Sequence, residues 1–218
     1  MVFTLALAGY LTVAALLVFH YHILVGDALA RVANAYYVLY SRDPHLAAIG
    51  FVWNPLPSLA EILLLPFKAL WPALVTDGFA GNILSAAAMA GAVAALNGTL
   101  AEARLRRPVR CLLVLGFAAH PLVVLYAGNG MSEAPFLLFL LLATRTLARW
   151  LRSGGVAPLV GTGVALGLAY LVRYETLAPG AVATGLVLVV GYARAAGDRR
   201  RRRDTALVEA GLVAAPFA

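Results

Sequence analysis

Six long apolar runs, each of 17 to 24 residues, set the strongest constraint on how this 218-residue chain folds. They cover residues 2–25, 79–100, 111–127, 133–151, 156–172 and 176–193. A helix of about 20 apolar residues is long enough to cross a bilayer. Only 12% of the residues are charged and 62% are hydrophobic, which is too apolar for a water-soluble domain. The sequence therefore predicts an all-α, polytopic transmembrane helical bundle.

The two ends of the chain need separate interpretation. No basic residue precedes the first run, and its apolar core is too long for a signal peptide, so we interpret it as a retained anchor. A seventh apolar run, 205–218, has 14 residues, which is shorter than a span. We therefore expect one transmembrane domain, 1–218, with six to seven spans. The short last run predicts either a C-terminally truncated protein or a helix lying on the membrane surface.

The distribution of arginine predicts the orientation of the spans. Thirteen of the 17 basic residues lie in three links, 101–110, 145–152 and 194–204. Basic residues concentrate in cytoplasmic loops, so these links are assigned to the cytoplasm and the links 128–132 and 173–175 to the outer face. Trp150 and Tyr192 then fall at the inner boundary. Because the basic clusters separate apolar runs, they indicate orientation in the membrane and no nucleic-acid partner. The run 199–203 is interpreted as a cytoplasmic anchor that contacts anionic lipid.

A long first outer loop, 26–78, separates the first two spans. Apolar and tyrosine side chains recur with helical spacing over residues 27–42, which predicts an amphipathic helix in the membrane interface. Residues 58–75 are also apolar, but Glu61 and Lys68 are costly inside a bilayer. Pro66 and Pro72 would also interrupt a spanning helix. We expect this segment to be a helix on or dipping into the outer surface, with an additional span as the alternative.

Asp27 stands at the head of this loop, directly after the first span. One interpretation is a helix N-cap, with Arg31 one turn later as its ion-pair partner. The other is a general base that accepts a proton from an acceptor hydroxyl at the membrane surface. The two roles are compatible, and the sequence leaves both open.

Three further charges lie at the outer mouths of spans: Glu133, Arg173 and Glu175. Ionisable groups at such positions are candidates for function. Glu133 could equally be a charge favoured by a helix N-terminus, and Arg173 could reach the interface beside Glu175. An acidic outer face suits a sugar hydroxyl or a divalent metal, and an isolated arginine suits a phosphate. Which metal, if any, binds is left open.

The cysteine and the histidines do not indicate a catalytic or metal-binding site. The single cysteine, Cys111, is expected to be buried and inert. His20 and His22 are two residues apart and cannot chelate one ion from a helix. His120 precedes Pro121, which predicts a helix kink. The sequence has no zinc-ligand spacing, phosphate-binding loop or nucleophile elbow.

Several short segments together resemble one enzyme class. They are Asp27 after the first span, the Pro-containing stretch 54–57 (NPLP), the mouth 131–135 (MSEAP) and the mouth 173–175 (RYE). This arrangement resembles the N-terminal part of the GT-C class of polytopic glycosyltransferases, related to protein O-mannosyltransferases and lipid A aminoarabinose transferases. The class's proline-proline-leucine stretch is altered here, and its second acidic residue is Ala28.

The resemblance implies an inverting glycosyltransferase in the plasma membrane, with its active face outside the cytoplasm. Its donor would be a polyprenyl-phosphate-linked hexose or pentose, and its acceptor a hydroxyl of a protein, lipid or polysaccharide. Asp27 would activate the acceptor, and Arg173 would stabilise the departing phosphate. Arg31, Glu133 and Glu175 would bind substrate. No cofactor is certain, and a divalent metal is compatible with the acidic outer face.

Two rival functions are compatible with the same pattern. A transporter or flippase of lipid-linked sugars would be expected to show repeated halves, but only the first half has a long loop. A non-catalytic module that packs against partner subunits would use small residues, such as those at 87–91 and 163–167. Those small residues serve internal packing equally well.

Overall fold

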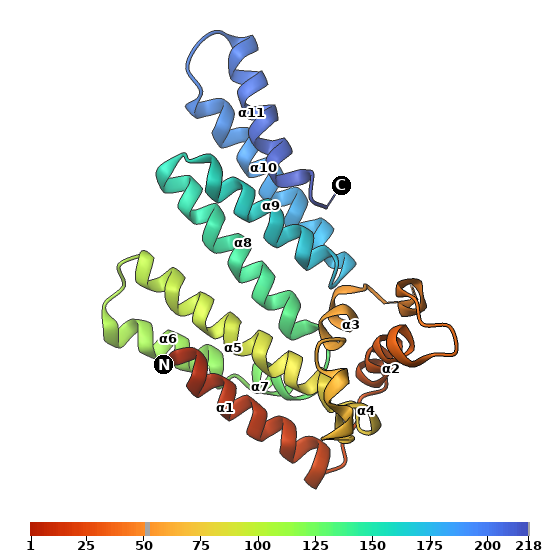
Figure 1. Ribbon diagram of the computed structural model, residues 1–218. Coiled ribbons are helices and arrows are strands. Elements are labelled where there is room, and N and C mark those ends of the chain that lie inside the picture. Colours follow the sequence, from red (N-terminus) through yellow and green to blue (C-terminus); the bar gives the residue numbers. More distant parts are fainter. Residues whose placement is uncertain (51–52, 218) are drawn as a thin grey trace. The chain divides into compact units, whose positions relative to one another are not determined.

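The computed structural model describes residues 1–50 and 53–217, and no strand occurs among them. Residues 51, 52 and 218, which belong to the predicted outer loop and the last apolar run, lie outside the described residues. The chain divides into two compact units, residues 1–138 and 139–218 (Figure 1). The all-α prediction is confirmed for the described part of the chain.

The first unit is built on apolar helices that pack along one another. Helix α1 (Val2–Ala15) continues through a π-helical turn, η1 (Leu16–His20), and packs against α5 (Phe79–Glu102) and α7 (Pro121–Gly128). Helices α1 and α5 run in opposite directions, so the end of α1 and the beginning of α5 meet at the same end of the unit (Figure 1). This end carries the candidate site.

The predicted outer loop forms a group of short helices at that end. They are α2 (Gly26–Tyr40), η2 (Leu46–Ile49), α3 (Leu56–Glu61), η3 (Leu65–Ala69) and α4 (Ala73–Thr76). The amphipathic helix expected at 27–42 is confirmed as α2. The single helix expected at 58–75 is wrong: Pro66 lies in the 3₁₀ turn η3 and Pro72 precedes α4, so the segment is three short pieces.

Lys68, whose charge would be energetically costly inside a membrane span, packs over aromatic rings of this group of helices. Its Nζ lies 3.3 Å from the ring centroid of Tyr40 and 4.5 Å from that of Tyr36. A cation over aromatic faces is attracted by the ring quadrupole. The contact attaches η3 to α2, so the lysine joins two elements of the loop.

The third predicted span, 111–127, is a broken pair of helices. Helix α6 (Arg107–Ala118) and α7 meet at an angle of 57°. Pro121 begins α7, and the Tyr10 hydroxyl donates a hydrogen bond of 3.0 Å to the carbonyl of Ala118, one of the carbonyls that the break releases. The kink expected at His120 is confirmed. Cys111 on α6 is exposed, so the expectation that it is buried is wrong.

The second unit contains the C-terminal part of α8 (Glu133–Ser153), followed by α9 (Val156–Tyr170), η4 (Tyr174–Thr176), α10 (Leu177–Arg194) and α11 (Arg199–Ala214). Helix α11 packs against α9 and α10. Trp150 is 1% exposed and belongs to the core of this unit. The guanidinium of Arg194 lies over its ring and donates to the carbonyl of Leu151 at 2.6 Å.

By length and composition, four described helices are able to cross a membrane, or five if the bent pair counts as one span. The four are Val2–His20, Phe79–Glu102, Glu133–Ser153 and Tyr174–Arg194. Helix α9 is apolar but has only 15 residues. The structure therefore supports four or five of the six to seven predicted spans. This number of apolar helices is consistent with a membrane protein.

The last predicted segment is also corrected. Helix α11 begins at Arg199, so the arginine run 199–203 is helical and is not part of a link. Asp198 is the N-cap, and its Oδ1 accepts a hydrogen bond of 2.9 Å from the backbone N–H of Arg201. The Asp198 cap therefore determines where α11 begins. The hydropathy of residues 205–218 does not indicate this start.

The close packing of α9 on α11 leads to a stability prediction. A Cβ at Gly163 would collide with the carbonyl oxygen of Leu212 and lie 3.3 Å from the Cα of Val213. We expect Gly163→Ala to lower the free energy of unfolding by about 1–3 kcal/mol through overpacking. Gly185→Ala is the matched control, since no atom lies within 4 Å of a Cβ there. Thermal unfolding of both variants in detergent measures the difference, and equal melting temperatures would contradict the packing.

Candidate functional site

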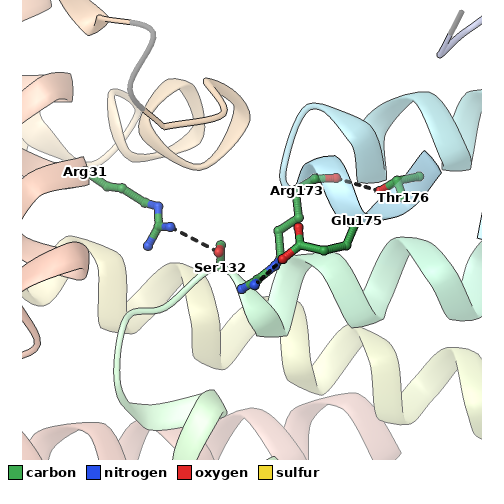
Figure 2. Close-up of polar contacts among 5 residues, drawn as sticks. All are labelled: Arg31, Ser132, Arg173, Glu175 and Thr176. Atoms are coloured by element: carbon green, nitrogen blue, oxygen red, sulfur yellow. Dashed lines mark hydrogen bonds and ion pairs between the residues drawn. The ribbon is translucent and has the colours of Figure 1, made fainter. Parts of the chain in front are cut away.

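Arg31 is the centre of a buried polar group at the outer-loop end of the first unit. Its side chain comes from α2 and is only 5% exposed. Its Nη2 donates a hydrogen bond of 3.1 Å to the Ser132 hydroxyl (Figure 2), and Nη1 lies 3.9 Å from the sulfur of Met131. Its guanidinium carbon also lies 5.0 Å from the ring centroid of Trp53. The cation is therefore held in a fixed position against the mouth 131–135.

The loop that receives Arg31 is itself fastened to α5. Asn82 donates a hydrogen bond of 2.5 Å to the carbonyl of Gly128, and the Ser85 hydroxyl accepts one of 3.2 Å from the backbone N–H of Gly130. Gly130 has a φ of +76°, and a Cβ there would lie 3.0 Å from the Cβ of Ala28. Only glycine combines this backbone conformation with this close approach. Two polar side chains of a span thus fix the shape of the mouth.

Glu61 supplies a second buried ionisable group. It is 1% exposed, and within the described residues neither carboxyl oxygen has a hydrogen-bond partner. A Cβ at Gly81 would lie 3.3 Å from Oε1, so the glycine leaves room for the carboxyl against α5. Burial raises the pKa of Glu61 to about 8, while the charge of Arg31 acts in the opposite direction. The carboxyl is mainly protonated at neutral pH.

Helices α2 and α3 are joined directly beside these two groups. The Ser58 hydroxyl, which is buried, donates a hydrogen bond of 3.0 Å to the backbone carbonyl of Arg31. Ser58 precedes Glu61 by one turn of α3. The same short helix therefore positions the backbone of Arg31 and carries the buried carboxyl.

Asp27 lies one turn before Arg31 on α2. The helix begins at Gly26 with Val25 as its N-cap, so the expectation that Asp27 is the N-cap is wrong. Asp27 sits in the first turn, where the helix dipole favours a negative charge. Among the hydrogen bonds and ion pairs of the described residues, none involves its half-buried carboxylate. The expected pair with Arg31 is absent there, because the guanidinium turns to Ser132.

The other predicted site residues fall into two groups. Glu133 is the first residue of α8 and follows Ser132, so the chain itself places it beside the Arg31 contact. Arg173 and Glu175 belong to the second unit and form an ion pair of 2.7 Å (Figure 2). The Thr176 hydroxyl donates a hydrogen bond of 2.8 Å to the Arg173 carbonyl, which fixes this turn at the start of α10.

Reasoning from the sequence missed the contributions of Glu61, Asn82 and Ser85. In the sequence Glu61 is a charge that disfavours a span, but an acid inside the run 59–65 (LAEILLL) is also a signal for a buried group. Asn82 and Ser85 lie one turn apart at the start of an apolar helix. Polar residues at this spacing share a helix face, which was the available clue.

The site offers three chemically different groups. Arg31 is a fixed cation suited to a phosphate, Glu61 is a mainly neutral acid, and Asp27 is a carboxylate free to accept a proton. Within residues 1–50 and 53–217, no three His, Cys, Asp or Glu side chains group closely enough to hold a metal ion.

Comparisons with family models, curated proteins and solved structures gave no match to this chain.

The buried carboxyl of Glu61 leads to a pH prediction. It keeps its proton in the folded chain to about pH 8, whereas the unperturbed group ionises near pH 4.5. Its contribution to stability is thus complete below pH 4.5 and is lost as the pH rises through 8. We expect the melting temperature of the wild type to fall between about pH 5 and pH 8 more steeply than that of Glu61→Gln, which cannot ionise.

The matched control is Asp43→Asn, which removes an exposed carboxylate from the same loop. It should keep the pH slope of the wild type. Parallel slopes for the wild type and Glu61→Gln would show that Glu61 does not titrate in this range in the folded chain.

Proposed function

We propose that this chain is the catalytic transmembrane part of an inverting glycosyltransferase of the plasma membrane. It would transfer a hexose or pentose from a polyprenyl-phosphate donor to an acceptor hydroxyl on the extracytoplasmic face. The observation that carries this proposal is the pairing on α2 of an uncommitted carboxylate, Asp27, with a fixed cation, Arg31, one helical turn away. Sugar transfer from a lipid phosphate needs these two kinds of group.

Asp27 acts as the general base in this mechanism. It accepts the proton of the acceptor hydroxyl while the hydroxyl oxygen attacks the anomeric carbon from the side opposite the phosphate. Its position supports the role in two ways. The carboxylate has no competing partner among the described residues. It lies one short segment after the first candidate span, which ends at His20, and a membrane-bound donor and a water-exposed acceptor would meet there.

An arginine stabilises the departing group. The bond between the anomeric carbon and the phosphate oxygen breaks, and polyprenyl phosphate leaves with the electron pair. A guanidinium matches the developing phosphate charge with two parallel hydrogen bonds. Arg31 and Arg173 are the two candidates, and each is already oriented by a neighbour, Ser132 for Arg31 and Glu175 for Arg173.

The remaining acidic residues bind sugar hydroxyls. Glu133 is the first residue of α8 and Glu175 lies in η4 just before α10, so each stands at one end of a candidate span, which in this proposal is the outer end. Carboxylates at such positions accept hydrogen bonds from hydroxyl groups. We assign each step to a protein side chain, with the donor's polyprenyl tail in the bilayer and the acceptor a protein, lipid or polysaccharide.

The test is a transfer assay on membranes that contain the 218-residue chain. A panel of polyprenyl-phosphate hexoses and pentoses is supplied, and released polyprenyl phosphate is measured by mass spectrometry. We expect Asp27→Asn to lower the rate of release by about 10²–10⁴-fold, the usual contribution of a general base, at an unchanged protein level.

Asp43→Asn is the control, because Asp43 is an exposed carboxylate of the same loop. It should keep the wild-type rate. Equal rates for Asp27→Asn and the wild type would remove Asp27 from the mechanism. A wild-type chain that releases no polyprenyl phosphate from any donor would refute the proposed activity of this chain.

A further inference from the structure

A basic groove in the second unit is separate from the site described above. It is open, has a volume of about 440 Å³ and is lined by Tyr192 of α10 and by Arg199, Arg200 and Arg203 of α11. The three arginines are exposed, and Tyr192 is 41% exposed. Helices α10 and α11 pack against each other, so one compact unit forms both walls.

Helix geometry divides the arginine run 199–203 into two sets. At 100° per residue, Arg199, Arg200 and Arg203 lie within one arc of α11 and face the groove. Arg201 and Arg202 point elsewhere. The Nε of Arg202 donates a hydrogen bond of 3.0 Å to the carbonyl of Gly197, and the side chain of Arg201 lies against the same glycine. The groove therefore presents only part of the run.

The charge of the three groove arginines is only partly balanced by the described acidic residues beside them. Asp204 pairs with Arg203 at 3.3 Å, but both side chains are more than half exposed, so this pair is weak. Asp198 is used as the N-cap of α11. The N-terminus of α11 adds a partial positive charge, so further cations here repel one another. An anion in the groove would relieve that repulsion.

The location indicates which anion is available. Tyr192 lies near the C-terminal end of the candidate span Tyr174–Arg194, where tyrosine is typical of the boundary between lipid and water. Arg194, the last residue of that span, donates hydrogen bonds to the backbone carbonyls of Trp150 and Leu151. The guanidinium groups of the groove thus follow directly on the end of a candidate span, where lipid headgroups are the nearest anions.

We propose that this groove binds the phosphate of an anionic phospholipid headgroup. Arg199 and Arg200 hold the phosphate oxygens with forked N–H pairs, and Arg203 adds positive charge on the same face. The Tyr192 hydroxyl contributes a hydrogen bond from α10. Binding joins α10 to the N-terminal turn of α11 through the lipid.

The experiment compares two double variants with the same loss of charge. Arg199→Gln/Arg200→Gln removes the groove arginines, and Arg201→Gln/Arg202→Gln removes their neighbours in the run. The purified full chain is titrated with phosphatidylglycerol in phosphatidylcholine-containing detergent micelles, and bound lipid is counted by native mass spectrometry. We expect the groove variant to lose roughly 30-fold in affinity, from about 1 kcal/mol for each arginine, and the control to stay near the wild type.

Three results would overturn this inference. Equal losses in both double variants would mean that only the net charge of the run matters. Inorganic pyrophosphate that competes fully with phosphatidylglycerol would identify a soluble phosphate ligand instead of a lipid. Retention of wild-type affinity by the groove variant would remove these arginines from lipid binding. Thermal unfolding in phosphatidylcholine alone checks that both variants fold, and Tyr192→Phe, which leaves the charge intact, should weaken binding to a smaller extent.

Discussion

The burial of Arg31 is the interaction on which the α2 end of the first unit depends. A cation removed from water must be compensated by hydrogen bonds, and here they come from residues about one hundred positions later in the chain. The loop around Gly130 can provide them only because Asn82 and Ser85 fasten it to α5. The hydrogen bond between Arg31 and Ser132 therefore fixes the position of α2, and with it that of Asp27.

The same constraint explains why an acid is tolerated in the apolar segment after α2. Glu61 lies close enough to Arg31 for the positive charge to act on its pKa, yet burial dominates and keeps the carboxyl mainly protonated. A neutral acid beside a fixed cation differs chemically from an ion pair. Glu61 therefore does not act as a full counter-ion to Arg31 at neutral pH.

Much of the fold follows from the sequence, because apolar length and proline placement act locally. The spans beginning at Val2, Phe79 and Glu133, the helix α2 and the break before Pro121 were all predictable. Helix ends were not: α11 begins at Arg199, directly after the cap Asp198 and six residues before its apolar part. The site was predictable only in part, since Asp27 and Arg31 stand out in the sequence, whereas the contact of Arg31 with Ser132 depends on tertiary packing.

The proposed function requires α2 with Asp27 to face outside the cytoplasm and the basic groove of α11 to face inside, which in turn requires both the bent pair α6–α7 and the 15-residue α9 to cross the membrane. This orientation is tested most directly by single cysteines at Arg42, exposed just after α2, and at Arg201 on α11, in a Cys111→Ser background because Cys111 is exposed. We predict that a membrane-impermeant thiol reagent labels Arg42→Cys in intact cells and Arg201→Cys only after permeabilisation. Labelling in the opposite order would place Asp27 in the cytoplasm and contradict the account.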